Sequence, residues 1–296
     1  MPTPYVMLNG RITEAQQAAV PIDDRAFLYG DSVFTTLRCY GGKPFRLDRH
    51  CARLNDSLRS RILAIDYTVD PTRLAADIAR LLEFYACPDA ALRFTISRGS
   101  GAGPLPPDSA RPTTLLTARS YRPDPARQHG VRLITTTVRR DPAGELGKHK
   151  LGSYAPSLLA RREAHAAGAY EGVISDTAGN LLECACSNLF AVADGKIITP
   201  DVSRNLLPGI ARETVFECVT RLAMPGKAGG HGDTPLHASM QDLTPDLIAR
   251  ADEMFITNSL IEVAPVASLD GRSFSAPGPT TEQLMHAYHQ KVMKEV

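Results

Sequence analysis

The sequence lacks several features that define large classes of proteins. It has no tryptophan, and its charges are balanced, because 33 basic residues stand against 32 acidic ones for a formal net charge of +1. A surface for nucleic acid or an anionic membrane would need a basic excess. No window holds about 18 consecutive apolar residues, and the first residues show no charged segment followed by an apolar one. We therefore expect a cytoplasmic protein that binds small molecules, and neither nucleic acid nor a membrane.

The chain also lacks the cysteine pairs of a zinc site. Its six cysteines include Cys184 and Cys186, one residue apart, but no second pair of Cys or His is suitably spaced. The other cysteines lie singly in apolar segments. This pattern indicates reduced, buried thiols, as in a cytoplasm, and predicts no metal.

What is present is a mixture of strand and helix signals. Asn9-Gly10 lies between two short strand-like segments and favours a tight hairpin, because both residues accept positive φ. Asp48 is expected to cap a helix, and Asp70, followed by Pro71, is expected to cap another. The glycine-rich segment 225–235 predicts an exposed, mobile loop.

These signals divide the chain into two parts. Residues 1–119 predict a small α+β domain, and the polar, proline-bearing stretch 120–130 is typical of a linker. Residues 131–296 carry many strands with interspersed helices, which predicts a larger domain with a curled, barrel-like sheet. With 43% apolar residues, the chain is long enough to bury a core in each.

Lys150 is the first candidate for chemistry. It lies just before an expected amphipathic helix, and apolar neighbours such as Leu151 would desolvate its amine, lower its pKa and so help it to form a Schiff base. An arbitrary lysine is far more often solvated. Lys148 is a rival, because residues two apart along an extended segment point to the same side. The pattern by itself does not separate the two lysines.

Glu183 is the second candidate, since it follows two leucines in an expected strand. A buried carboxylate is costly unless it is paired, and a protonated pyridine nitrogen would be a suitable partner. The alternative is a glutamate at the end of a strand in water.

A third set of residues could hold a phosphate. Pro208-Gly209-Ile210-Ala211 begins an expected helix, where backbone amides and the helix dipole favour an anion, although such a turn is usually only a cap. Thr257-Asn258-Ser259 could add further donors or simply end a strand. Arg53 offers a permanently charged fork, although an arginine on a helix surface is commoner. An amine, a carboxylate and a phosphate-binding turn are the parts that pyridoxal phosphate requires.

Taken in order, the motifs resemble the class IV aminotransferases, the pyridoxal-phosphate fold type IV family that includes branched-chain and D-amino-acid aminotransferases and 4-amino-4-deoxychorismate lyase. The resemblance extends over nearly the whole chain. Its motifs lie at residues 24–34, 50–54, 150–164, 183–190, 208–212 and 257–266.

The resemblance implies a two-domain α+β fold, with a small N-terminal domain and a larger C-terminal pseudo-barrel domain, and usually a homodimer. It implies that Lys150 is the catalytic Schiff-base lysine, because the spacing to residues 159–164 matches the family without a gap. The residues that it implies for pyridoxal 5'-phosphate are Arg53, Lys150, Glu183, Ser187, Asn188, Gly209, Ile210, Ala211 and Ser259. The candidates for the substrate are Phe34, Thr36, Arg38, Arg93, Arg98, Tyr154 and Asn258.

The reaction is less sharply indicated. Phe34-Thr35-Thr36 and the segment 257–260 are similar to the lyase branch, which releases 4-aminobenzoate and pyruvate in folate synthesis, and this is the reaction we expect. The alternative is an aminotransferase acting on branched-chain or D-amino acids with a 2-oxo acid acceptor, because the segment 37–40 is similar to the branched-chain enzymes. The segment 98–105 lacks both the Arg-Gly-Tyr common in the lyases and the Arg-x-His of the D-amino-acid enzymes. A catalytically inactive binding protein is a third reading, against which Lys150 and Glu183 argue.

Overall fold

The computed structural model describes residues 4–85, 88–107, 111–224 and 236–296, so the loop expected at 225–235 lies outside the described residues. Contacts divide the chain into two units. The first contains Met1–Arg122, His149–Tyr154 and Glu295–Val296, and the second contains Pro123–Lys148 and Ala155–Lys294. The borders expected for a linker at 120–130 stay predictions.

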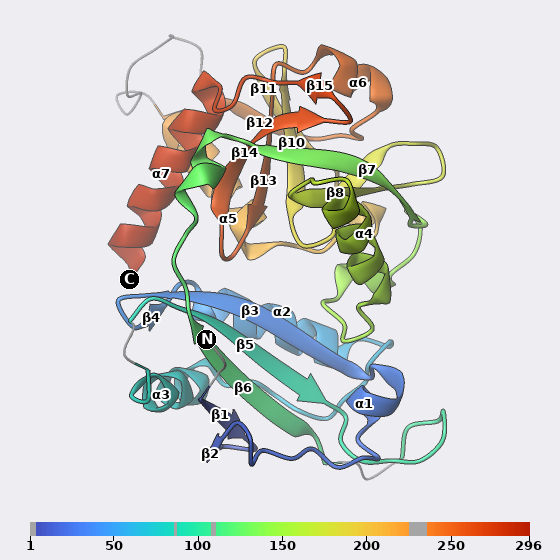
Figure 1. Cartoon of the computed structure of the whole chain (residues 1–296), viewed down its shortest axis with the longest axis vertical. Helices are drawn as coiled ribbons and strands as arrows, with labels where there is room; N and C mark the ends of the chain where they lie inside the picture. The colour runs from blue at the N-terminus through green and yellow to red at the C-terminus, as the bar shows by residue number, and fades with distance from the viewer. Residues whose placement is uncertain (1–3, 86–87, 108–110, 225–235) are drawn as a thin grey trace. The chain divides into compact units, whose positions relative to one another are not determined.

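The first unit is built on a six-stranded antiparallel sheet in the order β2-β1-β6-β5-β3-β4 (Figure 1). Its strands are β1 (Tyr5–Leu8), β2 (Arg11–Glu14), β3 (Ser32–Tyr40), β4 (Lys43–Pro44), β5 (Ala90–Ser97) and β6 (Thr113–Ser120). Its helices are α1 (Arg25–Tyr29), α2 (Leu47–Arg59) and α3 (Pro71–Leu82). The predicted Asn9-Gly10 hairpin joins β1 to β2, with positive φ at both residues.

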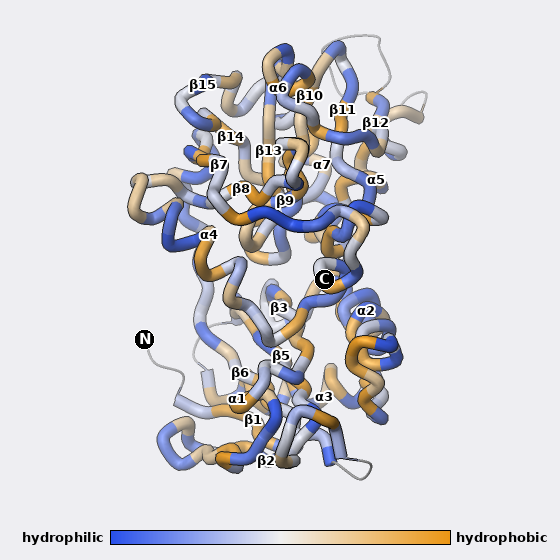
Figure 2. Tube along the Cα trace, turned by 90° about the vertical axis from the view of Figure 1, so that its right-hand side faces the viewer, coloured by the Kyte–Doolittle hydropathy of each residue, from blue (hydrophilic) through white to orange (hydrophobic). Residues whose placement is uncertain are grey.

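One face of this sheet packs on α2 and α3. The apolar residues of the two helices and odd-numbered residues of β3, among them Leu37, form one buried cluster. Figure 2 shows apolar and polar residues alternating along α2, as expected for a helix with one buried face. Asp70 caps α3 as predicted. The prediction for Asp48 is wrong, because the N-cap of α2 is a left-handed Arg46, two residues earlier, and Asp48 lies inside the first turn.

The second unit is built on a curled, mixed sheet of nine strands among the described residues. Its path is β12-β11-β10-β13-β14-β7-β8-β9, and β15 pairs with β14. The strands are β7 (Val131–Arg139), β8 (Glu171–Ser175), β9 (Leu181–Cys184), β10 (Asn188–Ala193), β11 (Lys196–Thr199), β12 (His237–Met240), β13 (Glu253–Asn258), β14 (Glu262–Leu269) and β15 (Arg272–Ser273). The helices are α4 (Ala155–Ala166), α5 (Ile210–Leu222), α6 (Pro245–Arg250) and α7 (Pro279–Glu295), with 3-10 turns at Pro125–His129, Leu146–Lys148 and Val202–Arg204.

The centre of this sheet is apolar, and the register of its strands determines which strand ends are neighbours. Every residue of β10 is buried, and the rings of Phe190 and Phe255 stack with centroids 4.6 Å apart. In the register of β10 and β13, Asn188 lies opposite Thr257. The start of β10 and the end of β13 therefore lie side by side.

The predicted α+β fold, with a small N-terminal domain and a larger C-terminal domain around a barrel-like sheet, is confirmed. No helix in the described ranges is long and apolar enough to cross a membrane.

Candidate functional site

The backbone around Lys150 is held against strand β3. The amide of Phe34 donates to the carbonyl of Lys150 over 2.9 Å, and the amide of Gly152 donates to the carbonyl of Ser32 over 2.8 Å. A Cβ at residue 152 would come within 2.1 Å of the Ser32 hydroxyl and 3.1 Å of the Gly30 carbonyl oxygen, so a larger residue would displace the Ser32 side chain. The segment that carries the lysine thus makes a single antiparallel bridge to β3, between Leu151 and Val33.

The side chain of Lys150 points at aromatic rings. Its amine lies 4.9 Å from the ring centroid of Phe34 and 5.8 Å from that of Tyr154. The two rings meet edge to face, with centroids 5.5 Å apart. Lys148 ends a 3-10 turn, so the extended segment that would have made it equivalent to Lys150 is absent.

Candidate substrate residues line the face of β3 opposite the helices. Side chains alternate along a strand, so Phe34, Thr36 and Arg38 share one face. Arg93 of β5 lies opposite Thr36 in the register and belongs to the same face. The guanidinium of Arg93 lies 3.4 Å from the Phe34 ring centroid. An aromatic ring thus has both Arg93 and the Lys150 amine beside it.

Arg38 is placed differently from Arg93. Its side chain is buried, and its guanidinium lies 4.2 Å from the ring centroid of Tyr40 and 5.1 Å from that of Tyr121. These contacts hold the side chain of Arg38 at the end of β3 that is opposite to Phe34.

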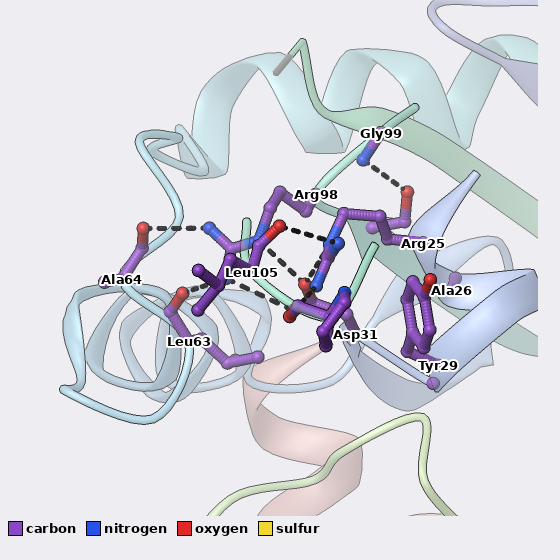
Figure 3. Close-up of polar contacts among 12 residues, drawn as sticks. Arg25, Ala26, Tyr29, Asp31, Leu63, Ala64, Arg98, Gly99 and Leu105 are labelled. Carbon is purple, nitrogen blue, oxygen red and sulfur yellow. Dashed lines mark hydrogen bonds and ion pairs between the residues drawn. The ribbon is translucent and has the colours of Figure 1, made fainter. Parts of the chain in front are cut away.

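Arg98 belongs to a cluster of charged residues that the sequence did not indicate (Figure 3). Two of its nitrogens donate to the carboxylate of Asp31 over 2.7 and 3.2 Å, and it also donates to the carbonyls of Leu63 and Ala64. Arg25 donates to the same carboxylate over 2.8 Å. Burial opposes the charge of Asp31, but the hydrogen bonds from Arg98 and then Arg25 outweigh it and lower the pKa of Asp31. Asp31 thus occupies the guanidinium fork of Arg98, and the arginine joins β5 to the loop after α2.

Arg53 lies on the helix-covered side of β3. It donates to the hydroxyl of Thr35 over 3.1 Å, and that oxygen lies 2.7 Å from Nδ1 of His50. Burial, with the nearby cations of Arg53 and Lys150, holds the pKa of His50 well below 6.5, so the imidazole is neutral at pH 7. Helix α2 thereby holds Arg53 in a fixed, largely buried network beside the lysine segment.

A second contact ties α2 to that segment. The Nδ1 atom of His149 lies 3.0 Å from the hydroxyl of Ser57, which donates to the carbonyl of Arg53. The residue before Lys150 and the backbone of Arg53 are therefore linked through one serine.

In the second unit, Glu183 is buried and paired. Arg140 forms an ion pair with its carboxylate, and Asn188 and the amide of Leu207 donate to its second oxygen over 3.2 and 3.4 Å. Arg140 also donates to the carbonyl of Asn205 over 3.1 Å. Glu183 is thus no strand-end residue in water, and Arg140 balances its charge. The sequence did not single out Arg140, which directly follows β7.

The start of helix α5 lies beside this carboxylate. Gly209 is its N-cap and supplies no capping side chain, and Ile210 and Ala211 are buried. A Cβ at residue 209 would come within 1.9 Å of Oδ1 of Asn188, so a larger residue would displace the Asn188 amide that bonds to Glu183. The first amides of a helix favour an anion.

The hairpin after β13 adds hydroxyl groups near the same strand ends. Thr257 is buried, and its hydroxyl has no hydrogen-bond partner within the part of the chain that the structure describes. Ser259 lies in the hairpin turn and is partly exposed. Ser187 and Asn258 bond to each other over 3.0 Å, and Ser187 donates to Glu171 over 2.7 Å. Sequence reasoning missed Glu171, for which the only signal was an acidic residue at the start of an apolar strand.

The chain is similar to known proteins over most of its length. Residues 32–269 match the family described as amino-transferase class IV. A branched-chain-amino-acid aminotransferase assigned in Methanocaldococcus jannaschii is 31% identical over 90% of this chain and 88% of that protein. D-alanine aminotransferase of Bacillus licheniformis is 28% identical over 98% of each chain. Aminodeoxychorismate lyase of Bacillus subtilis is 29% identical over 97% of this chain and 94% of that protein.

Solved structures share the fold of the whole chain. The branched-chain aminotransferase of Escherichia coli has a TM-score of 0.87 and 26% identity, and covers 100% of this chain and 96% of its own. The branched-chain aminotransferase of T.th., complexed with N-(5'-phosphopyridoxyl)-L-glutamate, has a TM-score of 0.86 and 28% identity with the same coverage.

Proposed function

Because the chain belongs to the class IV aminotransferase family, we propose that it transfers the amino group of a branched-chain aliphatic amino acid to a 2-oxo acid. The predicted family and the enzyme class, a class IV transaminase or lyase, are confirmed. The predicted cofactor is confirmed too, since similar enzymes hold a phosphopyridoxyl compound and pyridoxamine 5'-phosphate. The reaction and the residues that perform it are the proposal.

The residues of each unit fit pyridoxal phosphate. In the first unit, we propose that the amine of Lys150 would bind the aldehyde of the cofactor and that Arg53 would bind the phosphate of the cofactor. In the second, the carboxylate of Glu183 suits the pyridine nitrogen, and the α5 amides and the hydroxyl of Ser259 suit the phosphate. The hydroxyl of Thr257, without a hydrogen-bond partner among the described residues, supports an anion there. When bound, the group would supply an aldehyde suited to the substrate's amine and a ring suited to withdrawing electrons from its α-carbon.

The protein's part of the reaction is to bind the substrate and move protons. Lys150 is the base that removes the proton from the α-carbon, and its conjugate acid returns a proton. The rings of Phe34 and Tyr154 exclude water beside this amine. Arg140 forms an ion pair with Glu183 and balances its charge, and the Glu183 carboxylate can accept a hydrogen bond.

One observation carries the choice of an amino acid as substrate: Arg93 lies against Phe34, the ring that also contacts Lys150. A carboxylate bound by Arg93 would leave the substrate's aliphatic side chain against aromatic rings. Among the three candidate arginines, Arg98 is held by Asp31 and Arg38 is buried between two tyrosines. Arg93 is therefore our carboxylate-binding residue.

The relatives also favour an aminotransferase over the lyase that the sequence led us to expect. Branched-chain aminotransferases of Salmonella typhimurium and Escherichia coli, and a protein of Methanocaldococcus jannaschii assigned the same activity, are among the similar proteins. A structure of the T.th. enzyme, 28% identical to this chain, is complexed with 4-methylvaleric acid, a branched aliphatic acid. The lyase keeps support from similar proteins, among them the lyase of Bacillus subtilis at 29% identity.

The test is a spectrum of the purified protein with pyridoxal phosphate. We expect an L-branched-chain amino acid alone to convert the visible band of the lysine-bound cofactor to the near-ultraviolet band of the pyridoxamine form, and a 2-oxo acid to restore it. D-alanine and enzymatically generated aminodeoxychorismate are the comparisons. Release of 4-aminobenzoate and pyruvate with the visible band preserved would replace the proposal by the lyase.

We also propose that the enzyme is a homodimer. Three large apolar side chains on the first unit are strongly exposed: Ile22 at 81%, Phe27 at 74% and Leu105 at 80%. Arg25 of α1 donates to the carbonyls of Gly103, Pro104 and Leu105, so α1 and this loop are neighbours (Figure 3). An apolar patch of this kind suits a second copy. Light scattering should give twice the chain mass, and Phe27→Asp should reduce it to one chain.

A further inference from the structure

Glu171 is a buried carboxylate for which the proposed reaction has no use. It is the first residue of β8, and only 1% of its surface is exposed. One of its oxygens accepts a hydrogen bond from the amide of Cys186, and the other accepts one from the hydroxyl of Ser187 over 2.7 Å. A carboxylate is expensive to bury, and this one receives these donors from the turn between β9 and β10.

The hydrogen bonds continue from Ser187 to the next turn. A serine hydroxyl has one proton, which Ser187 donates in its hydrogen bond to Glu171, so the Ser187 oxygen is left to accept from Nδ2 of Asn258 over 3.0 Å. The amide of Asn258 is thereby oriented, and its Oδ1 accepts from the amides of Leu260 and Ile261 over 2.9 and 3.1 Å. These two bonds close the hairpin turn that contains Ser259.

We propose that Glu171 is a positioning residue that sets the shape of the Ser259 turn through Ser187 and Asn258, and so prepares that turn to bind the phosphate. The bond directions in this relay begin at the Glu171 carboxylate, whose oxygens accept from Cys186 and Ser187 and so leave the Ser187 oxygen to accept from Asn258. Ser259 is taken as a phosphate ligand, so the inference rests on the proposed function for that last step.

Replacing Glu171 by glutamine tests the relay because it reverses the direction of the bonds. The glutamine oxygen can still accept from Cys186, but its amide group then faces the oxygen of Ser187. Ser187 must turn its proton toward Asn258, which must rotate its oxygen toward Ser187. The donors of the Asn258 amide would then face the amides of Leu260 and Ile261, and the turn would open.

A second buried glutamate provides the matched control. Glu253 is 3% exposed and accepts from the amides of Thr280 and Thr281 and from the Thr281 hydroxyl at the start of α7. Glu253→Gln removes a similar buried charge in the same unit, away from the relay. Ser187→Ala breaks the relay and leaves the carboxylates of Glu171 and Glu253 in place. This variant tests the relay if Glu171→Gln does not fold.

The first measurement is amide hydrogen exchange of the whole chain without cofactor. We expect Glu171→Gln and Ser187→Ala to speed exchange at Leu260 and Ile261 about tenfold or more, and Glu253→Gln to leave it unchanged. The double variant Glu171→Gln/Asn258→Asp should restore protection, because a carboxylate at position 258 can accept from both Ser187 and the two amides. Unchanged exchange in Glu171→Gln, or no restoration in the double variant, would overturn the relay.

The second measurement is binding of the cofactor by the apo-protein. Glu171→Gln should weaken binding of pyridoxal phosphate about tenfold and change binding of pyridoxal, which lacks the phosphate, by less than about twofold. Equal losses for both compounds, or no loss, would contradict the role in phosphate binding. If the unaltered protein binds no pyridoxal phosphate, the proposed function fails, while the exchange experiment still tests the relay.

Discussion

The guanidinium of Arg93 lies 3.4 Å from the ring centroid of Phe34, close enough for the cation to rest on the aromatic face. The same ring lies beside the amine of Lys150. A single phenylalanine therefore defines the distance between a group suited to a carboxylate and a group suited to proton transfer at the neighbouring carbon.

Replacing Arg93 should weaken substrate binding. We expect Arg93→Gln to raise the KM for a branched-chain amino acid about 10- to 100-fold, because a charge-assisted hydrogen bond to the carboxylate is lost, and to change kcat less. Steady-state kinetics measure both constants. Arg122→Gln, at an exposed arginine of the same unit, is the control and should behave as wild type. A wild-type KM in Arg93→Gln would return the assignment to the other two arginines.

Replacing Lys150 and replacing Lys148 should have clearly different effects. Lys150→Ala should abolish the visible absorbance band of the bound cofactor and reduce kcat about 100- to 10,000-fold, because both the covalent attachment and the base are lost. Lys148→Ala should keep the band and most of the activity. A band that persists in Lys150→Ala and disappears in Lys148→Ala would move the catalytic role to Lys148.

Asp31 should stabilise the protein in a pH-dependent way. Its folded pKa is lowered, so its stabilising effect is present above the ordinary value of 3.8 and is lost as the pH falls through the folded pKa. Asp31→Asn should lower the free energy of unfolding by about 2–4 kcal/mol at pH 7, because Arg25 and Arg98 lose their shared anion. Urea unfolding should show that the difference in the free energy of unfolding between the wild type and Asp31→Asn narrows only below pH 3.8.

The control for Asp31 is Asp56→Asn, since Asp56 pairs with Arg59 in water on the surface of α2. Such a pair contributes little, and no measurable change is expected. A gap between wild type and Asp31→Asn that is the same at pH 3 and pH 7 would show that the charge of Asp31 has no part in the stabilisation.

Protonation of His50 should lower the free energy of unfolding as the pH falls. This loss should begin at a higher pH than the loss caused by protonation of Asp31. Its folded pKa lies well below 6.5, so the unfolded chain binds its proton first, and stability falls as the pH drops below 6.5. Thr35, Arg53 and Lys150 face it, and the two cations oppose its charge. Between pH 7 and pH 5, the free energy of unfolding of His50→Gln should fall by ~2 kcal/mol less than that of the wild type.

The measurement for His50 is the free energy of unfolding at several pH values, in which the slope, and not the value at pH 7, is diagnostic. His129→Gln, at an exposed histidine, should keep the wild-type slope. A His50→Gln protein with the wild-type slope would mean that the protonation of His50 does not contribute to the loss of stability.

Residues whose roles depend on local order were predictable from the sequence. Asn9-Gly10 forms its hairpin and Asp70 caps α3, because turn and cap preferences act within a few residues. The Asp48 prediction failed because a left-handed Arg46 starts α2 earlier, and no composition rule favours arginine in that conformation.

Residues that act through distant partners were not predictable. Arg140 meets Glu183 from 43 positions away, and Glu171 meets Ser187 from 16. Arg98 looked like a substrate ligand, since nothing in a linear motif reveals that Asp31, 67 positions earlier, occupies its fork. Such pairings arise from sheet register, which a single sequence leaves open.

The close packing at Gly152 also limits how this enzyme can evolve. Because a larger residue at position 152 would collide with the Ser32 hydroxyl and crowd the Gly30 carbonyl, the stretch that carries the lysine has little freedom to change where it bonds to β3. The neighbouring face of the sheet has no such restriction at Thr36, whose side chain projects from a strand that pairs through its backbone. Substrate preference can therefore drift by exchanging that side chain while the lysine amine and the carboxylate-binding Arg93 stay in place, which would allow one scaffold to serve several amino acids.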